Sequence, residues 1–580
     1  MIAFNGEIYN HLSLRETLDS VSNNVIEWIG HSDTETLLSC FETWGIDATL
    51  EKISGMFSIA LYDTEYDCLY LIRDRMGEKP LYYGWSGDVF LFSSELKPLK
   101  KFHGFSGEID RNVLALFLKY AYVPSPYSIY KGIKKLPQGS YVKISMVNNS
   151  WSREYIQGPN YYWSMNDIAE SGKGAKRFKG SEKDAIQKLD DLLSKSIKQQ
   201  MISDVPLGAF LSGGVDSSVV ASLMQKQSNK KIKTFTIGFK EKQYNEAEYA
   251  KKVALHLGTD HTELYITPEQ AIDVISRLPK IYDEPFADSS QIPTFLVSEM
   301  TKQHVTVSLS GDGGDELFGG YNRYFMANRA WTKIQKIPLT IRKLISQGIT
   351  LLSPNTWDCL INSAFKILPS SFKMSHPGDK IYKLSRMLTS NNIYDVYDGL
   401  VSHWSNSFEV VIGSKKRTNK VNKNIDFLHP EDEMMFLDSI TYLPDDILVK
   451  VDRAAMSVSL ETRAPFLDKN VVEFAWQLPF NMKIRNSQGK WILRKVLDRY
   501  VPNELVDRPK MGFGVPIDSW LRGPLREWAE DLLSEKRLKD DGYFHVEAIR
   551  EKWNEHLSGH RNWQYHLWSV LMFQIWLDDQ

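Results

Sequence analysis

The chain has 580 residues, 42% of them hydrophobic, and its length allows about two to four domains that each bury a core. Lysine and arginine number 70 against 72 aspartates and glutamates, a balance that argues against a nucleic-acid or membrane partner. No apolar run approaches the roughly 18 residues of a membrane-spanning helix, and the first residues form no basic-then-apolar leader. Three scattered cysteines exclude a disulfide framework and a zinc site. We therefore expect a cytoplasmic location.

Residues 1–155 predict a first domain built from helices and paired strands. Helical spacing of apolar residues covers 10–18 and 33–44, and Ser32 is placed to cap the second helix. Polar turns separate the strand patterns, which predicts two hairpins, made of residues 57–62 with 68–72 and 80–84 with 89–93.

A polar stretch at 156–180 is predicted to be a linker, and helices alternate with strands within 181–580. The predicted helices are 182–201 and 246–257, and the predicted strands are 205–211, 233–239, 261–266 and 305–309. This alternation predicts a parallel sheet with helices on both faces and ligands at the carboxyl ends of its strands. Residues 329–427 carry no chemical motif and predict an inserted helical subdomain, whereas the aromatic spacing of 563–576 predicts a core helix.

The most informative segment is a heptad that stands between a strand pattern and a helix pattern. Its sequence is Ser212-Gly213-Gly214-Val215-Asp216-Ser217-Ser218. The two glycines let the backbone approach a ligand closely, and three serine hydroxyls add donors where a helix start already favours negative charge. The heptad is neither a Walker A loop nor a GxGxxG fingerprint. Because Asp216 would repel a bare phosphate, we expect a pyrophosphate cradle with a divalent cation between carboxylate and phosphates.

A second glycine-rich segment, SGDGGDELFGGY at 310–321, follows the apolar strand pattern at 305–309. Together with the heptad, Asn5-Gly6-Glu7 and the segment around Asp33, it resembles the glutamine-dependent asparagine synthetases. These enzymes belong to the PP-loop ATP-pyrophosphatases, and the resemblance covers nearly the whole chain in colinear order. It implies an α/β fold. An N-terminal α+β sandwich of the N-terminal-nucleophile glutaminase type, truncated at its start, precedes a parallel-sheet ATP-pyrophosphatase domain with a helical extension.

The resemblance also implies roles for individual residues, with ATP and Mg²⁺ as cofactors. Adenosine is contacted by Leu211, Ile237, Ser310 and Gly311, and the phosphates lie on the heptad. Asp216 and Asp315 match the acids that hold Mg²⁺. Asp312 matches a residue that handles protons as ammonia attacks, and Lys510 matches the lysine that neutralises the leaving pyrophosphate.

In the first domain, the resemblance assigns glutamine binding to Asn5, Gly6, Glu7 and Asp33, with Asn5 and Gly6 stabilising the oxyanion. Those glutaminases carry a cysteine directly after the initiator methionine, whereas this chain begins Met1-Ile2-Ala3-Phe4. Cys40 and Cys68 fall in element patterns and are expected to be core thiols.

Without an activated nucleophile we expect no glutamine hydrolysis. A truncated start, which we favour, and a lineage that uses free ammonia both stay open. Simpler structural roles stay open as well, with Asn5-Gly6 as a turn and Asp33 as a helix N-terminal charge.

The implied reaction joins aspartate to ATP as β-aspartyl-AMP, releases pyrophosphate, and then forms asparagine with ammonia. The alternatives are an amidotransferase acting on uronic-acid carboxylates in surface polysaccharides, a β-lactam synthetase, and a non-catalytic nucleotide-binding remnant. Residues 283–290 are expected to border the acceptor pocket, Lys450 and Asp452 are candidates for an ion pair, and Arg463 is interpreted first as architecture. The expected partners are aspartate, ATP, and glutamine or ammonia, with a homodimer possible.

Overall fold

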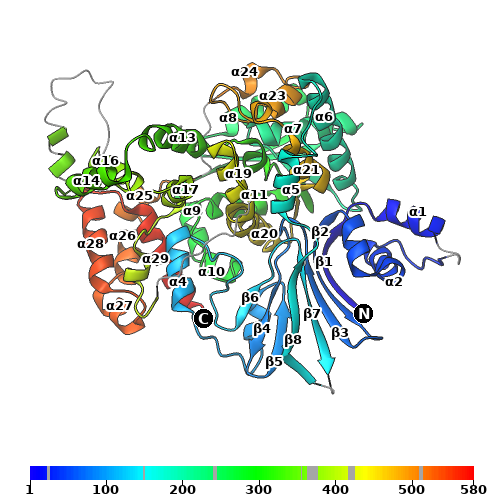
Figure 1. Ribbon diagram of the computed structural model, residues 1–580, viewed down its shortest axis with the longest axis horizontal. Coiled ribbons are helices and arrows are strands. Elements are labelled where there is room, and N and C mark those ends of the chain that lie inside the picture. The colour runs from blue at the N-terminus through cyan, green and yellow to red at the C-terminus, as the bar shows by residue number, and fades with distance from the viewer. Residues whose placement is uncertain are drawn as a thin grey trace.

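The computed structural model describes residues 1–21, 26–147, 150–239, 245–353, 356–358, 360–361, 377–415, 425–508 and 514–580. Figure 1 shows the chain as a β-rich N-terminal part and a larger, mainly helical part. None of the helices within these ranges is long and apolar enough to cross a membrane.

The N-terminal part is a sandwich of two antiparallel sheets with helices over one face. The larger sheet has the order β1-β2-β3-β7-β8 and the smaller one β5-β4-β6. Their strands are β1 (Ile2–Ile8), β2 (Gly55–Asp63), β3 (Cys68–Arg73), β4 (Tyr82–Ser86), β5 (Val89–Ser93), β6 (Ile133–Lys135), β7 (Ser140–Val147) and β8 (Ser150–Tyr161). The two predicted hairpins are therefore confirmed as β2–β3 and β4–β5.

Strand alternation explains why both faces of the larger sheet are covered. Ile59 and Leu61 of β2 pack with helices α1 (His11–Val21) and α2 (Asp33–Lys52). Ala60, between them, faces the smaller sheet, because successive side chains of a strand point to opposite faces. Ser32 caps α2 as predicted by accepting from the Glu35 amide at 3.3 Å, and the helix breaks at Gly45, where φ is 72°.

The helical part contains the predicted parallel sheet, in the order β11-β10-β9-β12-β13. Its strands are β9 (Leu207–Phe210), β10 (Lys233–Phe239), β11 (Asp260–Ile266), β12 (Val307–Leu309) and β13 (Glu461–Arg463). From β9 the chain runs outward to β11 on one side and then returns to β12 on the other. The strand order therefore reverses between β9 and β12, and a crevice at such a reversal is the usual ligand site of a parallel sheet.

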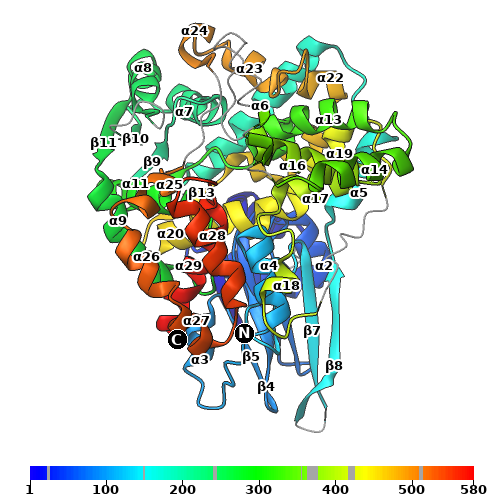
Figure 2. The ribbon, with the colours of Figure 1, turned by 90° about the vertical axis from the view of Figure 1, so that its left-hand side faces the viewer.

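Helices cover both faces of this sheet. One core lies among the central strands and helices α6 (Glu182–Gln200), α7 (Val215–Gln227), α19 (Pro430–Ile440), α21 (Lys469–Gln477) and α23 (Trp491–Leu497). Helix α8 (Ala247–Leu257) also belongs to this core through Ala250, Val253 and Ala254. A second core centres on α4 (Arg111–Tyr120), α9 (Pro268–Ile275), α11 (Gln291–Lys302), α20 (Leu448–Met456) and the C-terminal helices. Figure 2 shows α28 (Val546–Leu557) and α29 (Gln564–Asp578) on the same side of the molecule as α4.

The stretches predicted as linker and insertion contain regular structure. Residues 156–180 hold the end of β8 and helix α5 (Met165–Lys173), which packs on α21. Helices described within 329–427 are the end of α13 (Asn322–Ile334), α14 (Leu339–Thr350), α16 (Pro377–Leu388), α17 (Ile393–Val401) and α18 (Ser407–Val410). The limits of the domains stay predictions.

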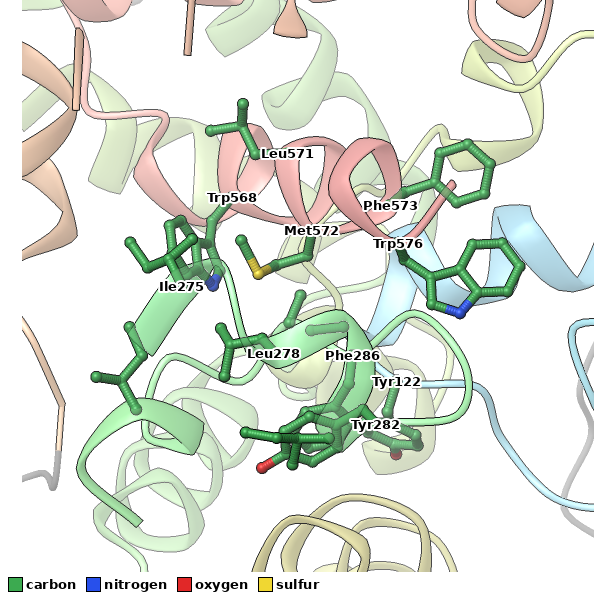
Figure 3. Packing of buried hydrophobic residues seen from close by; sticks show 14 of the residues in the cluster. Tyr122, Ile275, Leu278, Tyr282, Phe286, Trp568, Leu571, Met572, Phe573 and Trp576 are labelled. Carbon is green, nitrogen blue, oxygen red and sulfur yellow. The ribbon is translucent and has the colours of Figure 1, made fainter. Parts of the chain in front are cut away.

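Helix α29 is a core helix, as its aromatic spacing predicts. Trp568 and Trp576 are buried, and Figure 3 shows them over Ile275, Leu278 and the loop that carries Tyr282. The Trp576 indole nitrogen donates to the Asp283 carbonyl oxygen at 3.2 Å. The C-terminal helix thus holds the start of the segment that was predicted to border the acceptor pocket.

Replacing Trp568 by alanine should lower the free energy of unfolding by about 3–5 kcal/mol, because it opens a cavity in this core. Thermal denaturation would measure the change. Tyr565→Ala is the matched control on the same helix, because Tyr565 is 47% exposed, and we expect a loss below about 1 kcal/mol. Equal losses in the two variants would contradict the assignment of α29 to the core.

Candidate active site at the carboxyl ends of β9 and β12

The predicted cradle forms the turn between β9 and helix α7. Gly213 has φ of 74°, and a Cβ there would lie 2.7 Å from the Ala250 amide nitrogen, so the position requires glycine. Gly214 is the N-cap of α7, which begins at Val215. The orphan amides of the first helical turn therefore lie at the crevice, where they suit an anion.

Serine side chains organise this turn. The Ser212 amide donates to Ser217 Oγ at 3.1 Å, and the two hydroxyl oxygens lie 3.0 Å apart. The Gly214 amide donates to Ser212 Oγ at 3.2 Å. Ser218 is fully buried, and its hydroxyl has no hydrogen-bond partner among the described residues. The turn is thus held in shape by its own hydroxyl groups.

The second glycine-rich loop packs directly on the first. A Cβ at Gly314 would lie 2.5 Å from Asp216 Oδ1, and one at Gly311 would lie 2.9 Å from the Ser217 amide nitrogen. The Ser310 amide donates to the carbonyl oxygen of Arg463 in β13 at 2.8 Å, which fixes the start of the loop. The glycines are present because the two loops approach too closely for side chains.

A lysine that the sequence patterns did not single out joins these loops. Lys490 Nζ lies 2.6 Å from Asp315 Oδ1 and also hydrogen-bonds Asp216 Oδ2. Its side chain is 9% exposed; burial opposes its charge, but the two carboxylates hold its pKa above the usual range. Asp216 and Asp315, far apart in sequence, therefore converge on one cationic centre.

Close backbone packing makes room for this lysine. Gly489 passes against Gly319, where a Cβ would overlap the Gly319 carbonyl oxygen. A Cβ on Gly320 would overlap both Asp315 Oδ1 and Lys490 Cε. The sequence signal for Lys490 was a glycine immediately before a lysine at a helix start, which is too common to identify a site by itself.

Arg508 brings a further positive charge to the cradle. Its guanidinium donates to the Ser212 carbonyl oxygen at 3.2 Å and to Glu246 Oε1 at 2.9 Å, and it lies over the Tyr249 ring at 4.5 Å. Lys510 falls outside the described residues, so its predicted role stays a prediction.

The adenosine residues of the prediction lie along the same edge of the sheet. Leu211 and Ser310 directly follow β9 and β12, and Ile237 lies within β10. Leu211, Ile237 and Ser310 are all buried, with 1%, 2% and 3% exposure. Their burial matches an apolar wall that presents main-chain groups.

On the acceptor side, the suggested pairing of Lys450 with Asp452 is wrong. Lys450 Nζ instead lies 2.7 Å from Asp288 Oδ2, and Asp452 Oδ1 accepts from Lys79 Nζ at 2.9 Å. Residues two apart on helix α20 point in nearly opposite directions, so the two side chains cannot meet. The pair from 283–290 and α20 is therefore Asp288–Lys450.

The Asp288–Lys450 pair determines the charge of this region. Burial opposes ionisation of Asp288, but Lys450 and hydrogen bonds from Ser290 outweigh it and lower the pKa of Asp288 to about 2. Asp312 faces the same lysine; burial raises the pKa of its carboxyl, against a hydrogen bond with Ser310 and the charge of Lys450. A carboxyl with a raised pKa suits proton transfer.

The predicted glutamine-binding residues cluster around the end of β1. Asn5 Nδ2 donates to Ser94 Oγ at 3.0 Å, and Asp33 Oδ2 accepts from the Ile8 amide at 2.9 Å. A Cβ on Gly6 would overlap the Met56 carbonyl oxygen, so β1 and β2 require glycine there. Glu7 lies 3.6 Å from Arg463 of β13, which connects this segment to the parallel sheet.

Two further expectations concern structural residues. Cys40 and Cys68 are buried core thiols as predicted, and burial raises the pKa of Cys40 to about 12. Arg463 is architectural as predicted, because its guanidinium donates to the carbonyl oxygens of Gln200 and Ile202 at 2.7 and 2.8 Å.

Comparison with known proteins agrees with this geometry. The asparagine synthase family model matches residues 188–578, and a glutamine amidotransferase domain model matches residues 1–156. The chain belongs to the asparagine synthase family. This family member is 31% identical over 576 residues to asparagine synthetase [glutamine-hydrolyzing] 1 of Bacillus subtilis, covering 99% of the chain and 85% of that relative. It is 30% identical over 591 residues to a putative asparagine synthetase [glutamine-hydrolyzing] of Mycobacterium tuberculosis, covering 99% and 84%.

The family assignment confirms the resemblance, the mixed α/β fold with an N-terminal amidotransferase domain, and the enzyme class of a ligase. It does not test the individual site residues, and their roles stay predictions.

Gly320→Ala in this asparagine synthase family member should reduce ATP-dependent turnover at least about a hundredfold, because the new methyl group displaces Lys490 and Asp315. Release of pyrophosphate would measure the effect. Gly348→Ala is the matched control, since a Cβ there meets open space on helix α14, and turnover should not change. Full activity of Gly320→Ala would show that the Lys490 contacts are dispensable.

Glu7→Gln should stabilise the protein more at pH 8 than at pH 5. Burial raises the pKa of Glu7 from 4.5 to about 7 despite Arg463, so ionising it costs the folded state stability as pH rises through that window. Since the side chain is 30% exposed, we expect a difference on the order of 1 kcal/mol between the two pH values. Thermal denaturation at both pH values would measure this difference, with the exposed Glu16→Gln as control. A larger stabilisation by Glu7→Gln at pH 5 than at pH 8 would contradict the prediction.

Proposed function

We propose that this chain catalyses the ATP-dependent amidation of aspartate to asparagine through β-aspartyl-AMP. One observation carries the proposal. The two glycine-rich loops and Lys490 bring Asp216, Asp315 and a buried ammonium group together at the reversal point of the parallel sheet. Family membership supports ATP-dependent amidation as the reaction class, and the names of the relatives support aspartate as the acceptor.

ATP would lie across the carboxyl ends of β9, β10 and β12. The adenosine would contact Leu211, Ile237, Ser310 and Gly311, whose burial suits a base and whose main chain offers hydrogen bonds. The phosphates would lie on Ser212, Gly213, Gly214, Ser217 and Ser218 at the start of α7, where amide and hydroxyl donors meet the positive end of the helix.

Asp216 and Asp315 fit a Mg²⁺ ion that accompanies the phosphates, because carboxylate oxygens from two loops converge and oxygen is the ligand this ion takes. No group of three or more histidine, cysteine or acidic residues within the described ranges could hold a metal alone, so phosphate and water oxygens would complete the shell. The ion would neutralise phosphate charge when bound. Lys490, which lies between the same two carboxylates, would contribute positive charge beside the phosphates.

Catalysis by the protein groups follows from the charges. One β-carboxylate oxygen of aspartate attacks the α-phosphorus, and the bond from that phosphorus to the bridging oxygen of pyrophosphate breaks. Lys490 and Lys510 would stabilise the negative charge that grows on pyrophosphate. Such electrostatic stabilisation is usually the largest contribution to catalysis of phosphoryl transfer. Ammonia then attacks the acyl carbon, and the bond from this carbon to the oxygen that bridges it to phosphorus breaks, so AMP leaves with the bridging oxygen. Asp312 would receive the proton that the attacking nitrogen loses.

Free ammonia is the proposed nitrogen donor of the 580-residue chain. Of its three cysteines, Cys40 and Cys68 are buried in the first domain, and Cys359 lies outside the described residues. The raised pKa of Cys40 keeps it a thiol, which is a poor nucleophile. A cytoplasmic location and a homodimer stay predictions.

The purified 580-residue chain should form AMP and pyrophosphate from Mg-ATP only when aspartate is present, and asparagine only when ammonium chloride is added. Glutamine in place of ammonium should release no glutamate, because Cys40 and Cys68, the cysteines of the described residues, are buried core thiols that cannot start the thioester step. Chromatography of nucleotides and amino acids would measure all four products. Amidation of a uronic acid without turnover of aspartate would move the function to polysaccharide modification, and ADP formation would contradict nucleotidyl transfer.

A further inference from the structure

One buried carboxyl group beside the proposed acceptor position has no role in the reaction so far. Asp446 lies in a π-helical turn, Leu443–Ile447, that directly precedes helix α20. Such turns are rare and occur often at functional sites. Asp446 is 4% exposed, and within the described residues its Oδ1 atom has no hydrogen-bond partner. A buried acceptor without a partner is costly, so this atom points to a missing donor.

Asp446 lies four residues before Lys450, one helical turn away, so it shares a helix face with the lysine that pairs with Asp288. Burial raises the pKa of Asp446 well above its usual range, and the charge of Asp288 adds to the rise. Arg323, the other cation that acts on Asp446, is 2.6 Å from Asp438. If Asp446 ionises, the described residues offer it no cation of its own. An incoming ammonium group would supply both the charge and the donors.

The surroundings of Asp446 are aromatic. Burial raises the pKa values of Tyr122, Tyr282 and Tyr442, and the charge of Asp446 adds to the rise in each. Tyr442 lies one helical turn before Asp446, and all three phenols stay neutral. Rings with neutral hydroxyl groups suit an organic ammonium group, because they cover its carbon skeleton and attract its charge.

The position of this carboxyl group relative to the nucleotide loops fits an amino acid. Lys450 responds electrostatically to Asp446, Asp288 and also Asp312 of the second glycine-rich loop. One lysine side chain thus connects the acid pair with the loop beside the proposed adenylation centre. Asp288, at 18% side-chain exposure, gives the pair a route to solvent. A ligand between them would place a cation at one end and a carboxylate near ATP at the other.

We propose that Asp446, together with Asp288, binds the ammonium group of a substrate, first of all the α-ammonium of the acceptor amino acid. This subsite rests on the proposed function and deepens it, because it selects amino-acid acceptors over sugar acids that carry no amine. Free ammonium, the nitrogen donor, has the same chemistry and is the second source. Asp446 is thus a specificity residue, separate from the groups that stabilise the leaving pyrophosphate.

The test compares Asp446→Asn with the full-length parent enzyme on two acceptors, aspartate and succinate, which has the same two carboxylates and no amine. Pyrophosphate release at saturating Mg-ATP gives kcat and KM for each. The parent should prefer aspartate, and Asp446→Asn should raise KM for aspartate about tenfold to a hundredfold. KM for succinate, ATP and ammonium should stay unchanged. A rise confined to KM for ammonium would assign the subsite to the nitrogen donor instead.

Asp445→Asn is the matched control from the same turn. Asp445 points toward the first domain, where its Oδ2 atom accepts from the Ser125 amide at 2.7 Å. Its replacement should leave the ratio of kcat/KM for aspartate over succinate at the parental value. Thermal denaturation of both variants checks the fold. If turnover of Asp446→Asn is too slow to measure, equilibrium dialysis of the two acceptors with a non-hydrolysable ATP analogue gives the same comparison.

Unchanged KM values for both aspartate and ammonium in Asp446→Asn, with a parent enzyme that makes asparagine, would overturn the subsite alone. A parent enzyme that amidates a uronic acid and no amino acid would overturn the subsite and the proposed function together. An equal loss of aspartate preference in Asp445→Asn would also overturn it, since the effect would then belong to the turn and not to the carboxyl group.

Discussion

The site depends on one interaction, the ammonium group of Lys490 held between the carboxylates of Asp216 and Asp315. A charged lysine can be buried here only with such partners, because burying an unpaired charge would lower the stability of the fold by several kcal/mol. The contact also constrains the backbone around it. It requires glycine at 489 and 320, and it keeps the cradle after β9, the loop after β12 and the segment before α23 in one arrangement.

A second set of buried charges joins the two parts of the molecule. Lys79 of the first domain pairs with Asp452 of α20, and the neighbouring Arg453 reaches Glu95 at 2.7 Å. Arg453 also pairs with Asp452, so the three charges Lys79, Asp452 and Arg453 form one buried network across the contact. Removing Asp452 would leave Lys79 buried without this partner, which is costly. A small cavity lies behind the contact and is lined by residues of both parts, including Lys79 and Asp312. Residues of the first domain therefore line the space beside Asp312 of the second glycine-rich loop.

The sequence allowed the parallel sheet, both hairpins, the core helix α29 and the glycine-rich loops to be predicted, because each is encoded by a local period or a local composition. Lys490 was not predicted, because no local period or composition marks it. Its neighbourhood in sequence is ordinary, and its role arises from contacts with Asp216 and Asp315 that only the fold creates. Strand β13 is three residues long, too short to show a period. The pairing of Lys450 with Asp452 failed because proximity in sequence was taken for proximity in space.

The same comparison separates structural charges from functional ones. Most buried charges described here have partners whose geometry explains them, as Asp288 does with Lys450 and Asp452 with Lys79. Such pairs build the site and say little about its ligand. In the π-helical turn, Asp445 and Asp446 each leave one buried oxygen without a hydrogen-bond partner among the described residues. Asp446 differs from Asp445 because Asp445 accepts from the Ser125 amide, whereas the lysine one turn after Asp446 is already paired with Asp288. A folded protein tolerates that cost where a ligand removes it, so the incomplete interactions of a site are better evidence about its substrate than the complete ones.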